Sequence, residues 1–180
     1  MSICVALIRG INVGRGNRVA MADLRAMVGD LGHTEVRSLL NSGNIIFECK
    51  RPNVAKIALD IQTAIVANCG FSASVMVVTS QDLDRIIGEN PLLHTVNDHA
   101  RHLIAFVAHS KHLEPLRRLL KDSWKPDALA ITPHAAYIWC AGGILESRLL
   151  QSISRAAGDT ITTRNWATVL KLQAAAKRAT

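Results

Sequence analysis

The sequence contains the same order of predicted secondary structure twice. In the first half, an apolar run of strand length at residues 3–9 is followed by a helical pattern, a hairpin, a second helical pattern and another strand. The order recurs over residues 103–163, again starting with a fully apolar run. Such an order is typical of a ferredoxin-like sandwich, in which helices cover one face of a sheet. The sequence therefore predicts an α+β fold of two ferredoxin-like repeats, with a linking helix and a C-terminal helix.

Segment boundaries follow from this pattern. The first repeat is predicted at residues 1–79 and the second at residues 102–163. Residues 80–101 are predicted to form a linker with a short helix, because Thr79-Ser80-Gln81-Asp82 has the pattern of a capping box. Residues 164–180 are predicted to form the C-terminal helix. A chain of 180 residues can bury about 70% of its unfolded surface, so folding requires no disulfide or metal.

Two helices are predicted within the second repeat. Ser110 is expected to cap the first of them, and the second is expected to start near Leu145. Leucine and isoleucine side chains at helical spacing define their buried faces. These residues are Leu113, Leu116 and Leu120 in the first helix and Leu145, Leu149 and Ile153 in the second.

The composition indicates a globular cytoplasmic protein without a membrane span. Hydrophobic residues make up 49% of the chain and charged residues 19%, which excludes a disordered chain. The N-terminal apolar run is too short for a signal peptide core or a span, and it ends at Arg9. The cysteines lack a C-x-x-C pair, so we interpret them as reduced, mostly buried thiols. They are Cys4, Cys49, Cys69 and Cys140.

The excess positive charge is confined to the two ends of the chain. Lys and Arg number 21 against 14 Asp and Glu, which gives a formal charge of +7. Residues 1–22 and 160–180 contain no acid, while the basic and acidic residues between them balance. The unopposed cations are Arg9, Arg15 and Arg18 in the first segment and Arg164, Lys171, Lys177 and Arg178 in the second. The ends of the chain therefore favour an anionic partner.

A glycine- and arginine-rich stretch at residues 9–18 connects the first predicted strand to the first helix. Backbone N–H groups and a helix start can hold an anion at such a connection, and arginines can add bidentate contacts. The stretch matches neither a Walker loop nor a dinucleotide-binding fingerprint, because the required Gly-Lys-Ser/Thr and third glycine are missing. The alternative interpretation is that the glycines only allow the chain to turn between strand and helix, and that the arginines are solvated and bind no ligand.

Two further polar stretches complete a candidate site. The hairpin turn at residues 41–44 is predicted to lie beside residues 9–18, because the first two strands run in the same direction. Asn165 is expected to cap the last helix, next to Trp166. The alternative interpretation is structural: the first stretch is an ordinary hairpin turn, and the second is a helix cap followed by a tryptophan of the core. The candidate ligand-binding residues are Arg9, Asn12, Arg15, Asn17, Arg18, Ser42, Asn44, Arg164, Asn165 and Lys171.

The histidines raise a separate possibility. His109 and His112 are predicted at the same end of the second sheet as His134, and three imidazoles can bind Zn²⁺. Nothing in their spacing requires them to converge, so we assign no metal. Three others are expected to be exposed in the linker, namely His94, His99 and His102.

The polar stretches also carry a family resemblance. Four stretches are similar to motifs of the bacterial domain of unknown function 1697 family. They are residues 8–14 with Asn17, Met21 with Leu24, residues 41–44, and Arg164-Asn165-Trp166 with Thr168 and Val169. The resemblance covers nearly the whole chain and implies two ferredoxin-like repeats. It supplies no reaction and no cofactor. Arg15 departs from the family pattern, which usually has glycine there.

The function predicted from these observations is binding of an anionic ligand. The ligand would be a nucleotide-like small molecule or a nucleic-acid backbone, since both contain phosphate. An RNA-stacking sheet is disfavoured, because aromatic residues make up only 4% of the chain. No G-x-S-x-G or H-E-x-x-H motif indicates a nucleophile or a metalloprotease. The alternatives are an enzyme that acts on a phosphorylated substrate and a purely structural role for the motifs.

Overall fold

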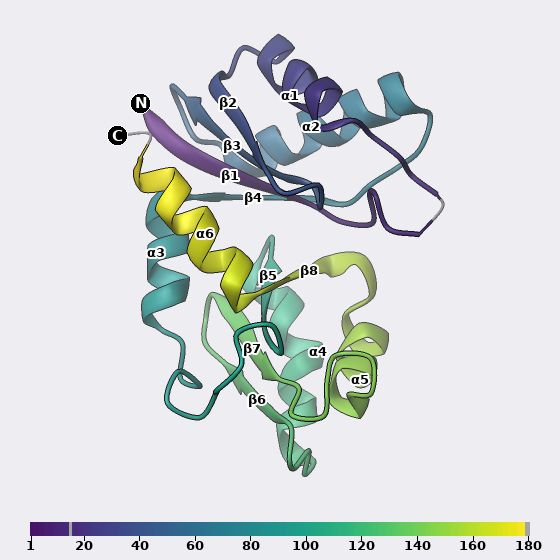
Figure 1. Ribbon diagram of the computed structural model, residues 1–180, viewed down its shortest axis with the longest axis vertical. Helices are drawn as coiled ribbons and strands as arrows, with labels where there is room; N and C mark the ends of the chain where they lie inside the picture. The colour runs from purple at the N-terminus through teal and green to yellow at the C-terminus, as the bar shows by residue number, and fades with distance from the viewer. Residues whose placement is uncertain (15, 179–180) are drawn as a thin grey trace. The chain divides into compact units, whose positions relative to one another are not determined.

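The computed structural model describes residues 1–14 and 16–178, and the chain divides into two compact units. Unit 1 comprises Met1–Asp84 and the end of the chain from Leu172. Unit 2 comprises Arg85–Lys171. Each unit contains a four-stranded antiparallel sheet with helices on one face (Figure 1). No helix of the described residues is long and apolar enough to cross a membrane.

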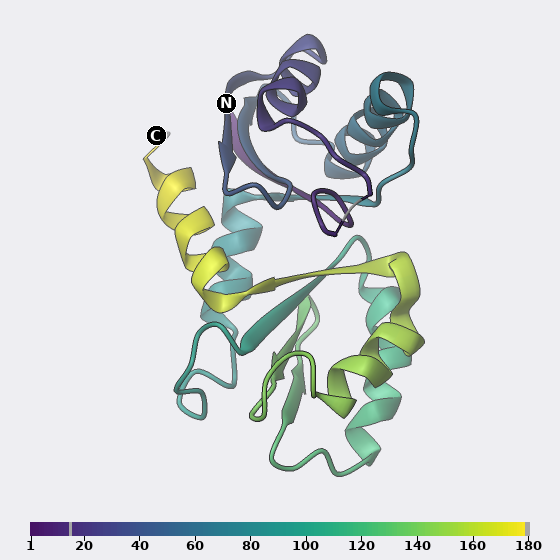
Figure 2. The same ribbon diagram turned by 45° about the vertical axis from the view of Figure 1, so that its right-hand side comes forward.

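Unit 1 has the predicted alternation of strands and helices. Its elements are β1 (Ser2–Ile8), α1 (Met21–Asp30), β2 (Thr34–Leu39), β3 (Asn44–Cys49), α2 (Val54–Cys69), β4 (Val75–Thr79) and the start of α3 (Ser80–Gly88). The strand order is β2-β3-β1-β4. Helices α1 and α2 lie side by side on one face of the sheet (Figure 2), over a core that includes Leu24, Phe47 and Ile61. Because β1 is a central strand that is buried on both faces, its sequence is a continuous apolar run.

Unit 2 repeats this topology. Its elements are β5 (His102–Val107), α4 (Glu114–Arg117) between the 3₁₀ helices η1 (Ser110–Leu113) and η2 (Arg118–Lys121), β6 (Ala128–Ile131), β7 (Ala135–Trp139), α5 (Arg148–Ala157), the 3₁₀ helix η3 (Gly158–Thr160), β8 (Ile161–Asn165) and the start of α6 (Trp166–Lys177). The strand order β6-β7-β5-β8 corresponds to that of unit 1. The predicted α+β fold of two repeats is therefore confirmed.

Two helix starts in unit 2 differ from the prediction. Ser110 does not cap a long helix, because the segment is broken into 3₁₀ and α pieces around Pro115, which has no N–H for a helical hydrogen bond. Helix α5 begins at Arg148, where Ser147 Oγ accepts the Leu150 N–H at 3.0 Å. Leu145 precedes this cap and is 89% exposed, so it is not part of the buried face. By contrast, the Thr79 cap is confirmed, since its hydroxyl accepts the Asp82 N–H at 3.1 Å.

His102 is buried rather than exposed in a linker. It is the first residue of β5, and its Nδ1 lies 3.1 Å from the Ile138 carbonyl oxygen. Its Nε2 lies 2.8 Å from the Asn90 amide nitrogen, and its ring packs against Trp166 with centroids 5.4 Å apart. Burial lowers the pKa of His102, so the neutral ring donates from Nδ1 and accepts at Nε2. The exposure prediction was wrong because polar partners on both sides allow this imidazole to enter the core.

The four cysteines are free. Cys4, Cys49 and Cys140 are buried and Cys69 is half-buried, which agrees with the interpretation as mostly buried thiols. Cys4 and Cys49 lie on neighbouring strands with their sulfur atoms 3.3 Å apart. Burial raises the pKa of Cys4 far above that of an exposed thiol, so it remains protonated and unreactive.

Candidate functional site

The loop from residue 9 to residue 19, between β1 and α1, is held in shape by asparagine side chains. Asn12 adopts a left-handed backbone conformation with φ of 55°, which asparagine tolerates better than most residues. Its Oδ1 accepts the Val19 N–H at 3.0 Å, and its Nδ2 donates to the Val19 carbonyl at 2.9 Å. Asn17 also has a positive φ, and its Nδ2 donates to the Gly10 carbonyl at 3.3 Å. The loop is therefore closed by its own polar side chains.

The β2–β3 turn lies against this loop, as the strand directions predict. Asn12 Nδ2 donates to the Asn41 carbonyl at 3.0 Å, and the Ile8 N–H donates to the Gly43 carbonyl at 2.8 Å. A Cβ on Gly43 would lie 2.9 Å from both the Ile8 carbonyl oxygen and Ile11 Cδ1. Gly43 also has a φ of 75°, so this position requires glycine for space and for conformation.

Asn44 ties the end of β2 to the turn through two side-chain hydrogen bonds. Asn44 is buried, and its Nδ2 donates to the Leu39 carbonyl at 3.0 Å and to Ser42 Oγ at 2.9 Å. These contacts fix the exit from β2 and the start of β3. Asn12 and Asn44, which the sequence suggested as ligand contacts, therefore also build the loop and the turn.

The predicted cations of this region differ in their surroundings. Arg9 follows β1, and its backbone N–H donates to the Ser74 carbonyl at 2.8 Å. Arg18 is exposed, and its guanidinium donates to the Gly14 carbonyl at 2.6 Å. Arg15 lies outside the described residues. Arg18 also lines a shallow cavity of about 440 Å³ together with Asp23 of α1 and Cys69 of α2.

The third predicted stretch belongs to unit 2. Arg164 lies in β8, and its guanidinium donates to Thr162 Oγ1 at 3.1 Å and to the Thr163 carbonyl at 2.8 Å. Burial lowers the pKa of Arg164 to about 10. Asn165 caps α6, as predicted, because its Oδ1 accepts the Thr168 N–H at 2.9 Å. Lys171 is exposed on the same helix. The structure thus joins the first two stretches in unit 1 and places the third in unit 2.

The histidines of unit 2 do not converge on a metal. The rings of His109 and His112 are 5.6 Å apart, but His134 Nδ1 instead lies 2.9 Å from a carboxylate oxygen of Glu89. Among the described residues, no group of three or more His, Cys, Asp or Glu side chains is arranged to hold a metal ion. Glu89 was absent from the sequence interpretation, because it lies in the linker and no local pattern relates it to the β6–β7 turn.

Comparisons with known proteins agree with the fold and the loop motifs. The conserved bacterial protein SP0830 from Streptococcus pneumoniae has a similar structure, with a TM-score of 0.74, 23% identity, and coverage of 97% of this chain and 98% of that chain. At this identity the similarity shows the fold alone. No curated protein matches the chain. A family model described as "Protein of unknown function (DUF1697)" matches residues 1–137, which include the loop and the β2–β3 turn. The chain therefore belongs to the DUF1697 family of proteins of unknown function.

Proposed function

We propose that the protein binds a phosphate-containing anion at the loop–turn surface of unit 1, formed by residues 9–14, 16–19 and 41–44. The observation that carries this proposal is the position of Asn12, whose side chain joins both ends of the loop and the Asn41 carbonyl. Loop residues that are already held by hydrogen bonds lose less conformational entropy when they bind a ligand. The free cysteines fit a protein that performs this binding in the cytoplasm.

Charge and backbone geometry favour phosphate as the ligand. Residues 1–22 contain arginines but no acid. Gly10 and Gly14 have positive φ values of 74° and 62°, and successive residues of opposite backbone hand can turn N–H groups toward an anion. Arginine adds paired N–H donors that match two phosphate oxygens. Nucleotides and nucleic-acid backbones share this group, so both belong to the proposed ligand class.

Isothermal titration with inorganic phosphate, a nucleoside monophosphate and a short single-stranded DNA tests the proposal. We expect Arg9→Gln and Arg18→Gln each to raise Kd by roughly tenfold or more, because a hydrogen bond to a charged group contributes about 1.5–3 kcal/mol. A steep fall in DNA affinity with added salt would identify backbone binding, whereas a weak salt dependence with the nucleotide would identify a small-molecule site.

Arg51→Gln is the matched control, because Arg51 is also an exposed arginine of unit 1. It follows β3, whose last residue pairs with Ser2 at the opposite end of β1 from the loop. Equal loss of affinity in Arg51→Gln and Arg18→Gln would contradict a defined site. If no probe binds the wild-type protein, the loop motifs have a structural role only.

The participation of the third stretch in ligand binding stays a prediction from the sequence. Its residues are Arg164, Asn165 and Lys171. Lys171→Gln is the informative substitution, because Lys171 is exposed whereas Arg164 and Asn165 make structural hydrogen bonds. We expect this variant to bind phosphate more weakly if the third stretch takes part in recognition. Unchanged affinity would restrict the proposed site to the loop–turn surface.

A further inference from the structure

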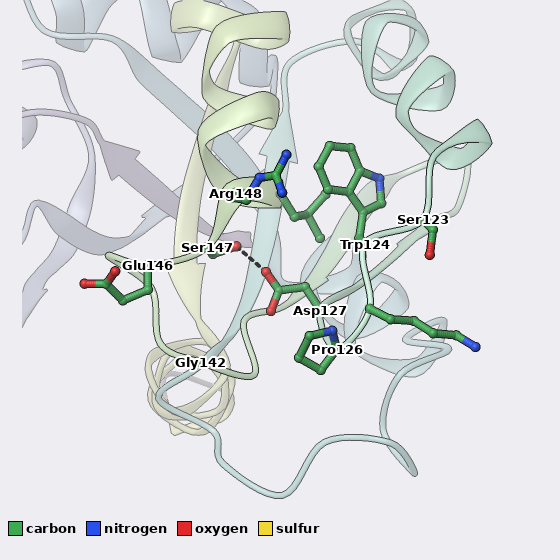
Figure 3. Close-up of a pocket in the computed structure, with 10 residues that line it drawn as sticks. Ser123, Trp124, Pro126, Asp127, Gly142, Glu146, Ser147 and Arg148 are labelled. Atoms are coloured by element: carbon green, nitrogen blue, oxygen red, sulfur yellow. Dashed lines mark hydrogen bonds between the residues drawn. The ribbon is translucent and has the colours of Figure 1, made fainter.

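Unit 2 contains a pocket that none of the sequence motifs indicated. It lies between the segment that precedes β6 and the loop that precedes α5, and it has a volume of about 260 Å³ (Figure 3). Trp124 and Pro126 line it from the first segment, and Ser147 and Arg148 line it from the second. Small-molecule sites commonly combine an aromatic wall with a few fixed polar groups.

The walls of the pocket are fixed by hydrogen bonds. Trp124 Nε1 donates to the Leu119 carbonyl at 2.7 Å, which sets the plane of the indole. Asp127 Oδ1 accepts the Ala141 N–H at 2.9 Å, and its Oδ2 accepts the Ser147 hydroxyl at 2.7 Å. Because Ser147 Oγ in turn accepts the Leu150 N–H, this polar network joins the two sides of the pocket. The pocket is therefore formed before any ligand arrives.

Two cations at the pocket have no carboxylate partner among the described residues. Lys125 and Arg148 are exposed, and neither forms a salt bridge there, although Asp127 and Glu146 also line the pocket. Both oxygens of Asp127 are occupied by the hydrogen bonds described above. In Figure 3 the Glu146 carboxylate points away from Trp124, whereas the Arg148 guanidinium lies on the indole side. The pocket therefore combines an indole with a guanidinium on the same side, while its two carboxylates are held by hydrogen bonds or point away from the indole.

We propose that this pocket binds a small planar aromatic anion. The ring of the ligand would stack on Trp124, since aromatic rings favour offset stacking, and its carboxylate or phosphate would contact Arg148 and Lys125. The volume of about 260 Å³ lies just below the usual range for small-molecule sites, so the ligand must be small. This site is separate from the loop–turn surface of unit 1, because all of its lining residues belong to unit 2.

Tryptophan fluorescence provides a direct test with the whole chain. Of the three tryptophans, Trp139 and Trp166 are buried, with 8% and 4% exposure, whereas Trp124 is half-buried at the pocket. We expect benzoate and phenyl phosphate to change the emission, and the tighter of the two to identify the preferred anionic group. Acetate and inorganic phosphate lack the ring, and benzyl alcohol lacks the charge, so these probes should have little effect. Trp124→Phe should remove the emission change while the thermal shift with the same probe persists.

Substitution of the cations tests the charge requirement. We expect Arg148→Gln and Lys125→Gln to raise the Kd of the better aromatic anion by roughly tenfold. Arg155→Gln is the matched control, because Arg155 is exposed on the same helix and donates to the Gln151 carbonyl away from the pocket. Circular dichroism verifies that each variant is folded.

Several results would overturn the proposal. The first is that neither aromatic anion changes the tryptophan emission at millimolar concentration. The second is that Arg148→Gln binds the aromatic anion as tightly as the wild type. The third is that Arg155→Gln loses as much affinity as Arg148→Gln. Arg9→Gln should leave this binding unchanged, and therefore failure here and failure of the loop–turn proposal are distinguishable.

Discussion

The two units share one sheet topology but differ at the connection that follows their first strand. In unit 1, residues 9–20 separate β1 from α1, and this long loop docks on the β2–β3 turn. In unit 2, only residues 108 and 109 separate β5 from the first 3₁₀ helix. The corresponding turn of unit 2 is instead bound by Glu89 of the linker, through His134. The strand order therefore determines where a connection lies, whereas its length and side chains determine what it contacts.

The comparison also separates two ways of stabilising polar groups. The β1–α1 loop of unit 1 relies on Asn12, which is half-buried, and on Asn17, which is exposed, so water can replace a lost partner there. Unit 2 relies on His102, which is fully buried between Asn90 and Ile138. A lost hydrogen bond costs more in a buried position, because the remaining polar atom is left without any partner.

The largest effect is expected at Gly43. Gly43→Ala introduces a Cβ that meets backbone at 2.9 Å in a residue with φ of 75°. We expect a loss of about 3 kcal/mol in the free energy of unfolding, measured by urea denaturation. Hydrogen exchange read by mass spectrometry should locate the loss in unit 1, around the loop and the turn.

Gly70→Ala is the matched control for this substitution. Gly70 has a φ of 74°, but no atom lies within 4 Å of the position that the alanine methyl group would occupy. We expect a cost of about 1 kcal/mol, from backbone conformation alone. Equal losses in the two variants would mean that the close approach of turn and loop contributes nothing.

The next largest effect is expected in unit 2. Asn90→Ala removes the donor to His102 Nε2 and also the acceptor for the Leu92 N–H. We expect a loss of about 2 kcal/mol at pH 8, again measured by urea denaturation. Substitution of the exposed His99 by glutamine should have almost no effect. A neutral result for Asn90→Ala would show that the buried imidazole finds another partner.

His102 also predicts a pH dependence for unit 2. Burial lowers its pKa below the ordinary 6.5, so the unfolded chain binds a proton more readily than the folded chain. Stability from this group is present above pH 6.5 and is lost as the pH falls through the folded pKa. Hydrogen exchange at pH 8 and pH 5 should therefore show faster opening around His102 at the lower pH, after correction for intrinsic exchange rates.

The sequence predicts the fold well, because continuous apolar runs and apolar residues at helical spacing directly reflect burial. Both sheets and the proximity of residues 9–18 to residues 41–44 follow from pattern and strand direction. The errors occur where a long-range contact decides the outcome. His102 has the local sequence of a linker, and only the distant Ile138 carbonyl and Asn90 amide make its burial favourable. Pro115 favours a break in the helix, because it has no backbone N–H, but the helical spacing of the leucines predicted a continuous helix.

The candidate site was predictable only in part for the same reason. Residue types identified the loop and the turn, but they did not show that Asn12 and Asn44 bond to backbone carbonyls. The pocket around Trp124 was not predictable, because its walls come from segments that are separated along the sequence and have no common motif.

A smaller effect is expected from the loop asparagines of unit 1. Asn12→Ala removes hydrogen bonds to Val19 and Asn41 and leaves alanine in a left-handed conformation, so we expect a cost of about 1.5 kcal/mol. Asn17→Gly retains the backbone freedom and removes one exposed bond of 3.3 Å, so its cost should be about 0.5 kcal/mol. Thermal denaturation of both variants gives the comparison. A larger loss of stability in Asn17→Gly than in Asn12→Ala would contradict the proposed role of Asn12 in holding the loop against the turn.

The smallest effect is expected at the Glu89–His134 pair. Its side chains are 31% and 40% exposed, so loss of the pair in Glu89→Gln should cost about 0.5 kcal/mol near neutral pH. The hydrogen bond from His134 holds the pKa of Glu89 below the ordinary 4.5. Stability from Glu89 is therefore present above pH 4.5 and lost as the pH falls through its folded pKa, a window below that of His102. Urea denaturation of Glu89→Gln should show a flatter decline in this acidic window, whereas Glu146→Gln, an exposed control, should follow the wild type. If Glu89→Gln also follows the wild type throughout, the linker contact does not stabilise the β6–β7 turn, and the two units differ there in sequence but not in energy.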